Sequence, residues 1–244
     1  MSEYQKMVND IFFNEDFHDL LFKDGIKPFQ KDEIRFERAL LALNYPNGKQ
    51  IYELGPYPGT GMYYFGANNK IIGLGNSSPD FQNKVRKIGH HLISVNFDTN
   101  NDIKHLIKAD IVLVMEVLEH IRMPYQFLQN LVKLLKPGGM AYLTTNNRSY
   151  IGYIIKLLFS KPILDPIDSE GSFYPGHCRY YGLCELNEIF VKMGFTILQA
   201  NHVNFLPNAG LYKNVVFGAL KNFLVKSLPI RFSTHIEILI KKNE

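Results

Sequence analysis

The stretch Ala109-Asp-Ile-Val-Leu-Val-Met-Glu-Val-Leu-Glu-His-Ile121 decides the fold. Its apolar residues Ile111–Met115 form a continuous run of strand length, which is typical of a strand buried on both faces. The polar residues Glu116, Glu119 and His120 follow directly. Because ligands in open α/β sheets bind at the carboxyl ends of strands, this strand end is a candidate functional site.

The same rhythm of short apolar runs and helical stretches continues on both sides of this strand. A helix with Phe127 to Leu135 along its apolar face should end at Pro137-Gly138-Gly139, because proline and glycine interrupt helices. Continuous apolar strands that alternate with helices predict an α/β fold with a parallel sheet covered on both faces. The four other strands of this sheet are expected at Gln50–Leu54, Lys70–Leu74, Leu92–Val95 and Met140–Thr145.

Three segments flank or interrupt the core. We expect a helical cap over residues 1–47, a core over 48–204 that includes an inserted lid at 146–182, and a C-terminal segment over 205–244 with an insertion helix and the last core strand. The lid is predicted from its prolines, glycines and aromatic residues. The remaining expected elements are helices at Gln30–Leu43 and Glu185–Met193 and strands at Phe195–Asn201 and Ile236–Ile240.

The bulk composition sets limits on function. The 244 residues are 46% hydrophobic, enough for a packed core, and the net charge of +4 is weak for a dedicated nucleic-acid binder. We find no signal peptide and no apolar run of the roughly 18–20 residues that a membrane span needs, so a cytoplasmic location is expected. The basic amphipathic stretch Val215–Leu228 is expected to pack on the domain, with peripheral membrane contact as the less favoured alternative.

A glycine-rich turn follows the first expected strand. The sequence Ile51-Tyr-Glu-Leu-Gly-Pro-Tyr-Pro-Gly-Thr-Gly61 runs from a strand into a helix that should begin near Met62. Glycines let the backbone approach a ligand closely, and the first N–H groups of a helix are available to bind one. The turn therefore indicates a pyrophosphate site or the site for the amino-acid end of a cofactor, with an ordinary strand-to-helix turn as the alternative.

Two further motifs, Leu134-Leu-Lys-Pro-Gly-Gly139 and Tyr142-Leu-Thr-Thr-Asn146, complete a recognisable set with the 109–121 stretch. Together they resemble the class I S-adenosylmethionine (SAM) dependent methyltransferases, in particular members related to the ubiquinone-biosynthesis O-methyltransferases. The resemblance spans about residues 48–200. It implies a Rossmann-like sheet of seven strands, five of them parallel and two forming a terminal pair. It also implies SAM as the cofactor and S-adenosylhomocysteine as the product.

The resemblance further implies the positions that hold the cofactor. The glycine loop with its preceding acid would line the methionine and ribose, the residues after the third strand would accept from the adenine amino group, and the end of the fourth strand would line the methyl-transfer site. In chain order, these candidates are Glu53, Gly55, Gly59, Gly61, Gly75, Asn76, Asn96, Asp98, Met115 and Glu116.

The second strand departs from the family pattern. The family usually has an acid there that binds both ribose hydroxyls, and Gly75 stands in its place, followed by Asn76. A neutral amide makes a weaker hydrogen bond than a carboxylate does. This departure leaves open an alternative reading, in which the chain is a methyltransferase-like binding protein without catalysis.

The segment Gly176-His-Cys-Arg-Tyr-Tyr181 supplies candidates for substrate chemistry. The ordinary pKa of histidine lies near neutral pH, so His177 is expected to be the general base. His120 is the second candidate, with a cap of the local turn as its alternative role. Arg179 could clamp an anionic acceptor and Tyr181 could contact it; the alternative is that His177 and Arg179 only hold the lid to the body. No metal site is predicted, because Cys178 and Cys184 with His177 lack the paired spacing of zinc ligands.

The sequence thus predicts transfer of a methyl group from SAM to a small-molecule acceptor. The preferred acceptor is a hydroxyl of a sugar, a nucleotide-sugar or a phosphorylated metabolite. A nicotinamide-dependent oxidoreductase is disfavoured, since it would need a tighter Gly-x-Gly-x-x-Gly turn and an acid about 20 residues further on. A nucleic-acid methyltransferase is disfavoured by the modest charge. The oligomeric state is left open.

Overall fold

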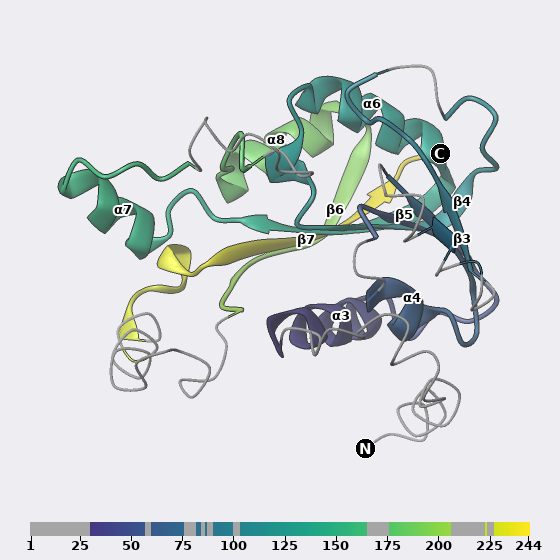
Figure 1. Cartoon of the computed structure of the whole chain (residues 1–244), viewed down its shortest axis with the longest axis horizontal. Helices are drawn as coiled ribbons and strands as arrows, with labels where there is room; N and C mark the ends of the chain where they lie inside the picture. The colour runs from purple at the N-terminus through teal and green to yellow at the C-terminus, as the bar shows by residue number, and fades with distance from the viewer. Residues whose placement is uncertain are drawn as a thin grey trace.

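The computed structural model describes residues 30–56, 60–75, 82–83, 86, 90–99, 103–164, 176–205, 223 and 227–244. The strands in this part of the chain form one seven-stranded sheet in the order β3-β2-β1-β4-β5-β7-β6 (Figure 1). All strands but β7 run in the same direction. The strands are β1 (Gln50–Leu54), β2 (Lys70–Leu74), β3 (His91–Ile93), β4 (Ala109–Met115), β5 (Leu135–Asn146), β6 (Phe195–Val203) and β7 (His235–Lys242).

The predicted α/β class and the five parallel strands with a terminal pair are confirmed. Central strand β4 is buried along nearly its whole length, as its continuous apolar sequence predicts. Strand β3 is shorter than expected and ends at Ile93. In the part of the chain that the structure describes, no helix is long and apolar enough to cross a membrane.

Helices cover both faces of the sheet. In Figure 1, α3 (Gln30–Ala42) and α4 (Thr60–Phe65) lie on one face, and α6 (Pro124–Leu134) and α8 (Leu183–Lys192) lie on the other. The core between α3, α4 and the sheet includes Phe36, Leu40, Met62 and Phe65. Because α3 belongs to this core, the described part of the expected N-terminal cap packs directly on the sheet. Residues 1–29 of that cap lie outside the described residues.

The Pro137-Gly138-Gly139 motif lies within a strand. Helix α6 ends at Leu134 and β5 begins at Leu135, so the expectation that the strand begins at Met140 was wrong. Ala109 of β4 pairs with Leu135, whereas Ile111 pairs with Met140, so the residues between them bulge out of the ladder. Gly138 takes φ +71°, a conformation that glycine adopts without strain. The motif thus makes an irregular strand entry rather than a loop.

Strand β7 inserts between β5 and β6 and carries a buried acid. Glu237 is 0% exposed. It alternates with the apolar residues Ile236 and Ile238, a pattern that is typical of a strand with one face in water. Arg38 of α3 donates two hydrogen bonds to its carboxylate, and Tyr142 donates a third at 2.8 Å. Gln199 and Asn201 of β6 add bonds of 2.9 and 3.0 Å. Burial alone would raise the pKa of Glu237, but these bonds outweigh it and lower that pKa.

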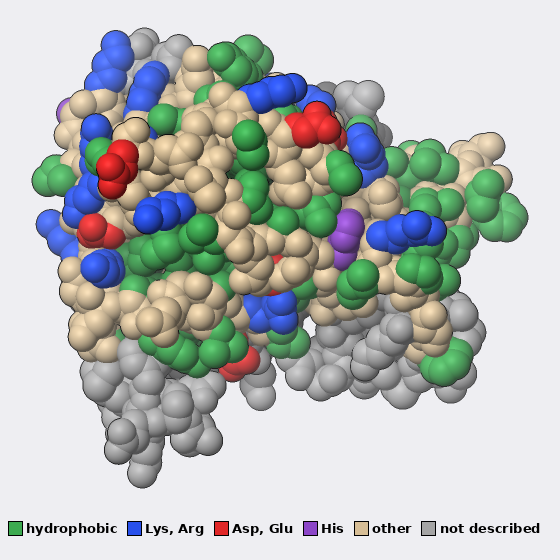
Figure 2. Space-filling model, turned by 180° about the vertical axis from the view of Figure 1, so that it is seen from behind, with side chains coloured by type: hydrophobic (Ala, Val, Ile, Leu, Met, Phe, Trp, Pro, Cys, Tyr) green, Lys and Arg blue, Asp and Glu red, His purple; other side chains and the backbone are tan. Residues whose placement is uncertain are grey.

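The expected lid contains one described helix. Helix α7 (Ile151–Leu158) projects beyond the carboxyl ends of the strands in Figure 1 and buries none of its own residues. Figure 2 shows hydrophobic side chains gathered on this projecting end, where Leu157, Leu158 and Phe159 are exposed. Residues 165–175 of the lid and nearly all of the expected insertion helix at 215–228 lie outside the described residues.

Candidate active site

The carboxyl ends of β1, β2 and β4 meet at one edge of the sheet. The N–H of Gly55, just after β1, donates to the carbonyl of Leu74 at 2.9 Å, and the N–H of Gly75 donates to Ile93 at 3.1 Å. Gly55 has φ +63°, and a Cβ there would lie 2.9 Å from Cγ2 of Val117. The glycine turn after β1 therefore touches the segment that follows β4, so both sequence motifs share one site.

Glu53 anchors the glycine loop from inside the sheet. Its side chain is 3% exposed, and Oε1 accepts the N–H of Gly61 at 2.9 Å. A Cβ at Gly61 would lie 2.6 Å from Oε2 of Glu53 and closer still to its Cδ and Oε1, so only glycine fits there. Oε2 is buried and has no hydrogen-bond partner among the described residues. A buried acceptor oxygen facing this loop suits the ammonium group of a bound amino acid.

The protonation of Glu53 makes stability depend on pH. Burial raises the pKa of Glu53 to about 7, while the N–H groups of Gly61 and Met62 pull it down in part. The native state therefore holds a proton that the unfolded state releases above its ordinary pKa of 4.5. This stabilisation is complete below the ordinary pKa of 4.5 and is lost as the pH rises through about 7.

The Glu53→Gln variant should lose this dependence, because its amide does not titrate. Relative to the wild type, its free energy of unfolding should rise by up to about 3 kcal/mol between pH 5 and 8. Urea unfolding of the ligand-free proteins at several pH values measures the difference. Glu188→Gln, which changes an exposed acid on α8, is the control and should follow the wild-type profile. A constant difference between Glu53→Gln and wild type would contradict the assignment.

The expected adenine-binding residues stabilise a neighbouring loop. Oδ1 of Asp98 accepts the N–H groups of Arg122 and Met123 at 3.0 and 2.9 Å, and Oδ1 of Asn96 accepts the N–H of Asp98. These hydrogen bonds thus connect the loop after β3 to the segment that follows β4. Gly59 and Asn76 lie outside the described residues, so the ribose side of the site is defined here by Gly75 alone.

Glu116 sits in a strained position at the end of β4. It has φ +56°, unusual for a residue with a side chain. Its carboxylate lies 3.5 Å from the guanidinium of Arg35 on α3 and 3.1 Å from Nε2 of His235 on β7. Burial would raise the pKa of Glu116, but these two partners outweigh it and lower that pKa. Met115 lies beside it and accepts from the Thr144 hydroxyl at 3.8 Å.

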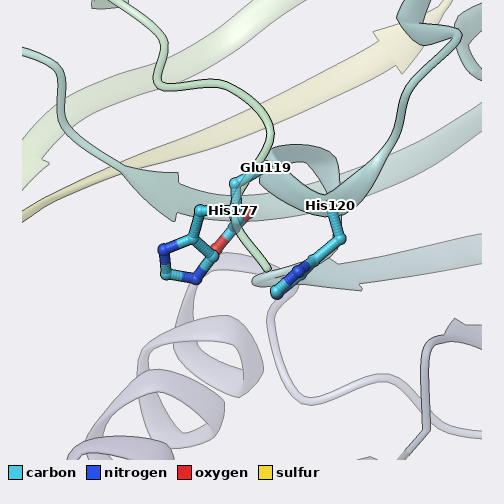
Figure 3. A group of neighbouring side chains, drawn as sticks. All are labelled: Glu119, His120 and His177. Atoms are coloured by element: carbon cyan, nitrogen blue, oxygen red, sulfur yellow. The ribbon is translucent and has the colours of Figure 1, made fainter. Parts of the chain in front are cut away.

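A second polar cluster lies one turn further along, on the 3₁₀ helix η1 (Leu118–His120). Glu119 is 0% exposed, and its carboxylate accepts from Thr145 at 2.9 Å and from Asn146 at 3.0 Å. Burial and the nearby carboxylate of Glu116 raise the pKa of Glu119. Figure 3 shows the carboxylate of Glu119 beside the ring of His177, with His120 on the other side. The centroids of the two imidazole rings are 4.8 Å apart, so the two predicted candidates for the base are neighbours.

Backbone hydrogen bonds bring His177 to this position. The carbonyl of Glu119 accepts the N–H of Cys178 at 2.7 Å and that of Arg179 at 3.3 Å. Nδ1 of His177 lies 3.0 Å from the hydroxyl of Tyr180, and that hydroxyl donates to the carbonyl of Ile163 at 3.1 Å. The ring of Tyr180 also stacks on Tyr153 of α7, with centroids 4.5 Å apart. The lid is therefore attached to the cluster through its aromatic residues.

The two expected substrate contacts differ in position. Arg179 is exposed, and its guanidinium already pairs with Glu185 at 2.9 Å. Tyr181 is a core residue: it is buried, its hydroxyl bonds to the carbonyl of Leu118, and its backbone pairs with Asn147. The buried ring of Tyr181 therefore packs in the core rather than facing an acceptor.

Sequence reasoning missed several members of the site. Arg35 is 4% exposed and lies 5.1 Å from the ring of Phe205, and His235 packs on the same ring. The sequence singles out neither Tyr153, one of the lid's aromatic residues, nor Tyr180, which lies within the 176–181 segment. None of them carries a local signal, because each reaches the site through a contact between distant parts of the chain.

Comparison with known proteins agrees with this geometry. The model of the methyltransferase-domain family matches residues 16–200, most of the chain, so the chain belongs to that family. Its fold and family make it a class I SAM-dependent methyltransferase, and SAM is the cofactor of this class. The family and the cofactor predicted from the sequence are thereby confirmed.

Individual relatives are more distant. The chain is 27% identical over 127 residues to the ubiquinone biosynthesis O-methyltransferase of Hydrogenovibrio crunogenus. The aligned region covers 52% of the chain and 50% of that protein. A mitochondrial counterpart from Dictyostelium discoideum is 27% identical over 164 residues, covering 58% of the chain and 49% of that protein. The chain thus spans about half the length of these relatives.

Solved structures confirm the fold. A SAM-dependent methyltransferase from Mesorhizobium loti superposes with a TM-score of 0.58 at 14% identity, covering 86% of this chain and all of that one. The 1,6-didemethyltoxoflavin-N1-methyltransferase of Burkholderia thailandensis, crystallised with 1,6-didemethyltoxoflavin and S-adenosylhomocysteine, gives 0.58 at 12% identity, with coverages of 99% and 90%.

Proposed function

We propose that the chain transfers a methyl group from SAM to a hydroxyl oxygen of a cyclic small molecule. The observation that carries this proposal is the pair of imidazoles, His120 and His177. They lie beyond the end of β4, and His120 is close along the chain to Val117, whose side chain lies against the glycine turn. A hydroxyl is a weak nucleophile until its proton is removed, and imidazole is the side chain best suited to remove it near neutral pH.

The residues around the loop fit the cofactor. Glu53 offers its unpartnered Oε2 to the ammonium of the methionine end, and the glycines at 55 and 61 leave room for it. Glu116 and Met115 border the place where the methyl group would be delivered. When bound, SAM supplies an electrophilic methyl group that needs no activation by the protein.

The protein itself then orients the acceptor and takes up its proton. The hydroxyl proton passes to an imidazole nitrogen of His177 or His120. The lid, attached through Tyr153 and Tyr180, excludes water and holds the acceptor ring. Asp98 stabilises the loop beside the adenine side of the site.

Two acceptor classes follow from different features. The stacked rings of Tyr153 and Tyr180 beside His177 favour a flat aromatic acceptor, and the relatives named as ubiquinone biosynthesis O-methyltransferases point the same way. The exposed Arg179 favours the anionic sugar or phosphorylated acceptor expected from the sequence, provided that the anion displaces Glu185. We place the aromatic acceptor first, because the rings that would contact it already line the cluster.

Calorimetry with SAM, S-adenosylhomocysteine and NADH tests the cofactor, and methyl incorporation into catechols and sugar phosphates tests the acceptor. We expect micromolar binding of the first two ligands and none of NADH. The His120→Ala/His177→Ala double variant should lose about 100-fold or more in turnover while SAM binding persists. Unchanged turnover in this variant would refute the base assignment. Failure to bind SAM or S-adenosylhomocysteine would favour the non-catalytic binding protein, to which the missing acid at Gly75 points.

A further inference from the structure

We propose that the edge of the sheet opposite the candidate active site binds single-stranded nucleic acid. The amino ends of β1, β2, β4 and β5 form this edge, together with the carboxyl end of β7, which runs the other way. The modest net charge of +4 conceals the edge, because the positive charges of the chain are unevenly distributed. The proposal is independent of the proposed function, since the two sites lie at opposite ends of the strands.

Five neighbouring strands each place a lysine at this edge. In the order of the strands across the sheet, β2, β1, β4, β5 and β7, these lysines are Lys70, Lys49, Lys108, Lys136 and Lys241, and they are called the basic edge below. Adjacent strands lie about 4.8 Å apart, so the row is roughly 19 Å long. Figure 2 shows Lys and Arg side chains gathered at the left of the view, the end of the molecule at which these strands begin.

Most of the positive charge of the basic edge is not neutralised within the described part of the chain. Four of its lysines are exposed and form no ion pair with any described residue: Lys49, Lys70, Lys108 and Lys241. The fifth, Lys136, donates to Asp110 at 2.7 Å, and this acid also accepts the N–H of Gln50. Burial lowers the pKa of the adjacent Lys242, and the charge of Lys108 lowers it further. The cations therefore repel one another, and a polyanion would relieve this repulsion.

A cavity of about 440 Å³ opens within the basic edge. Lys49 and Lys136 line it, together with Gly138 and with Tyr45 from the turn after α3. The side chain of Tyr45 is 40% exposed, and the N–H of this residue donates to the carbonyl of Leu40 at 2.8 Å. The cavity thus combines a flat aromatic ring with two cationic amines. Proteins that bind single strands use the same combination, in which cations contact phosphates and bases stack on aromatic rings.

The backbone that carries this ring is strained. Asn44 and Tyr45 have φ +53° and +47°, and neither is glycine. Two successive residues in the left-handed region cost free energy, and such strain is found mainly at functional sites. The turn also places the ring of Tyr45 at the cavity rather than in the core between α3 and the sheet. The strain therefore supports a binding role for Tyr45.

A single strand fits this edge better than other anions do. Protein interfaces are depleted in lysine, so an acidic protein is a poorer match for a row of five lysines. The bases of a duplex are stacked inside it and do not enter a cavity. A membrane surface would contact the lysines but leave the cavity and its ring unused. A single strand uses both features, because its phosphates follow the row while one base enters the cavity.

Fluorescence anisotropy with a labelled oligodeoxythymidylate of about 12 nucleotides tests the proposal. We expect micromolar binding at about 50 mM salt and a loss of about 100-fold in affinity by about 200 mM salt. This loss follows because five lysines that neutralise phosphates of a single strand give a slope of about −3.5 in a plot of log affinity against log salt. Binding of SAM, measured by calorimetry, should be unaffected by the oligonucleotide.

Two variants separate the charge from the ring. Lys49→Ala/Lys241→Ala should weaken oligonucleotide binding at least about 10-fold at low salt and reduce the slope by about 1.4. Tyr45→Ala should weaken binding about 10-fold with an unchanged slope, whereas Tyr45→Phe should bind as the wild type does. The matched control is Lys156→Ala/Lys161→Ala, which removes two exposed lysines of the lid and should leave binding unchanged.

Three results would overturn the proposal. They are the absence of oligonucleotide binding at low salt, an equal loss in the two double-lysine variants, and tighter binding of a polyglutamate peptide or of phosphatidylglycerol vesicles than of the oligonucleotide. The calorimetry with SAM keeps these results distinct from a failure of the proposed function. Wild type that binds SAM but no oligonucleotide retains the methyltransferase proposal alone. Wild type that binds the oligonucleotide but no SAM retains the basic edge alone.

Discussion

Replacing Gly61 with alanine should weaken SAM binding at least about 30-fold, even though it adds a single methyl group. The added Cβ would lie 2.6 Å from Oε2 of Glu53 and closer to two other atoms of that carboxyl group. Glu53 is buried in β1 and cannot swing aside, so the loop must move away from it. That movement breaks the bond from the Gly61 N–H and displaces the oxygen proposed to hold the methionine end. Calorimetry with SAM or S-adenosylhomocysteine measures the loss.

Gly182→Ala is the matched control, because it adds the same methyl group outside the glycine loop. A Cβ there would meet only the flexible guanidinium of Arg148, which can move aside, so affinity should stay within about threefold of the wild type. A double-mutant cycle locates the cause: in a Glu53→Ala background, Gly61→Ala should cost much less than it does alone. Equal losses in the two backgrounds would show that the loop, and not Glu53, sets the affinity.

Replacing Glu237 with alanine should lower the free energy of unfolding by about 3–5 kcal/mol, a large part of the stability of a single domain. The carboxylate accepts from Arg38 of α3, Tyr142 of β5, and Gln199 and Asn201 of β6. Its removal leaves these donors without their shared acceptor, and the hydroxyl of Tyr142 is buried. The loss should appear as a lower midpoint of urea unfolding with an unchanged slope.

Lys136→Ala provides the comparison for Glu237. It also breaks an ion pair, the 2.7 Å contact with Asp110, but both partners are partly exposed. Such pairs contribute between 0 and about 1 kcal/mol, so this variant should unfold close to the wild-type midpoint. If the two variants were destabilised to the same extent, the buried carboxylate would not be the element that links α3 to the sheet.

The elements with a local pattern could be predicted from the sequence. The apolar run of β4 and the glycine turn after β1 are each recognisable from a few consecutive residues. The sheet, the direction of its strands and the edge that binds the cofactor could therefore be predicted. The prediction that Pro137-Gly138-Gly139 separates the helix from the strand was wrong. A bulge places these residues, which usually end helices and strands, inside the β4–β5 ladder. Its geometry depends on pairing with Ala109 and Ile111, which no local pattern encodes.

The site itself was only partly predictable, for the same reason. Glu116, His120 and His177 were identified as candidates one by one. The partners that set their chemistry, Arg35 and His235, reach Glu116 only after α3 and β7 have packed. The meeting of His120 with His177 depends on the backbone carbonyl of Glu119, an atom that every residue possesses. Contacts of this kind leave no compositional trace.

The insertion of β7 between β5 and β6 also constrains the folding pathway. Strands β5 and β6 both precede β7 in the sequence. The edge of β5 that pairs with β7 therefore stays unpaired until β7 is added. Contacts of such high sequence separation form slowly, because the entropy of closing a long loop is lost first. During this interval, the apolar edge of β5 is open to pairing with a second chain, so refolding yield should fall as protein concentration rises. The hydrogen bonds from Arg38 and Tyr142 to Glu237 require β7 to be in place, and they stabilise it in its native register.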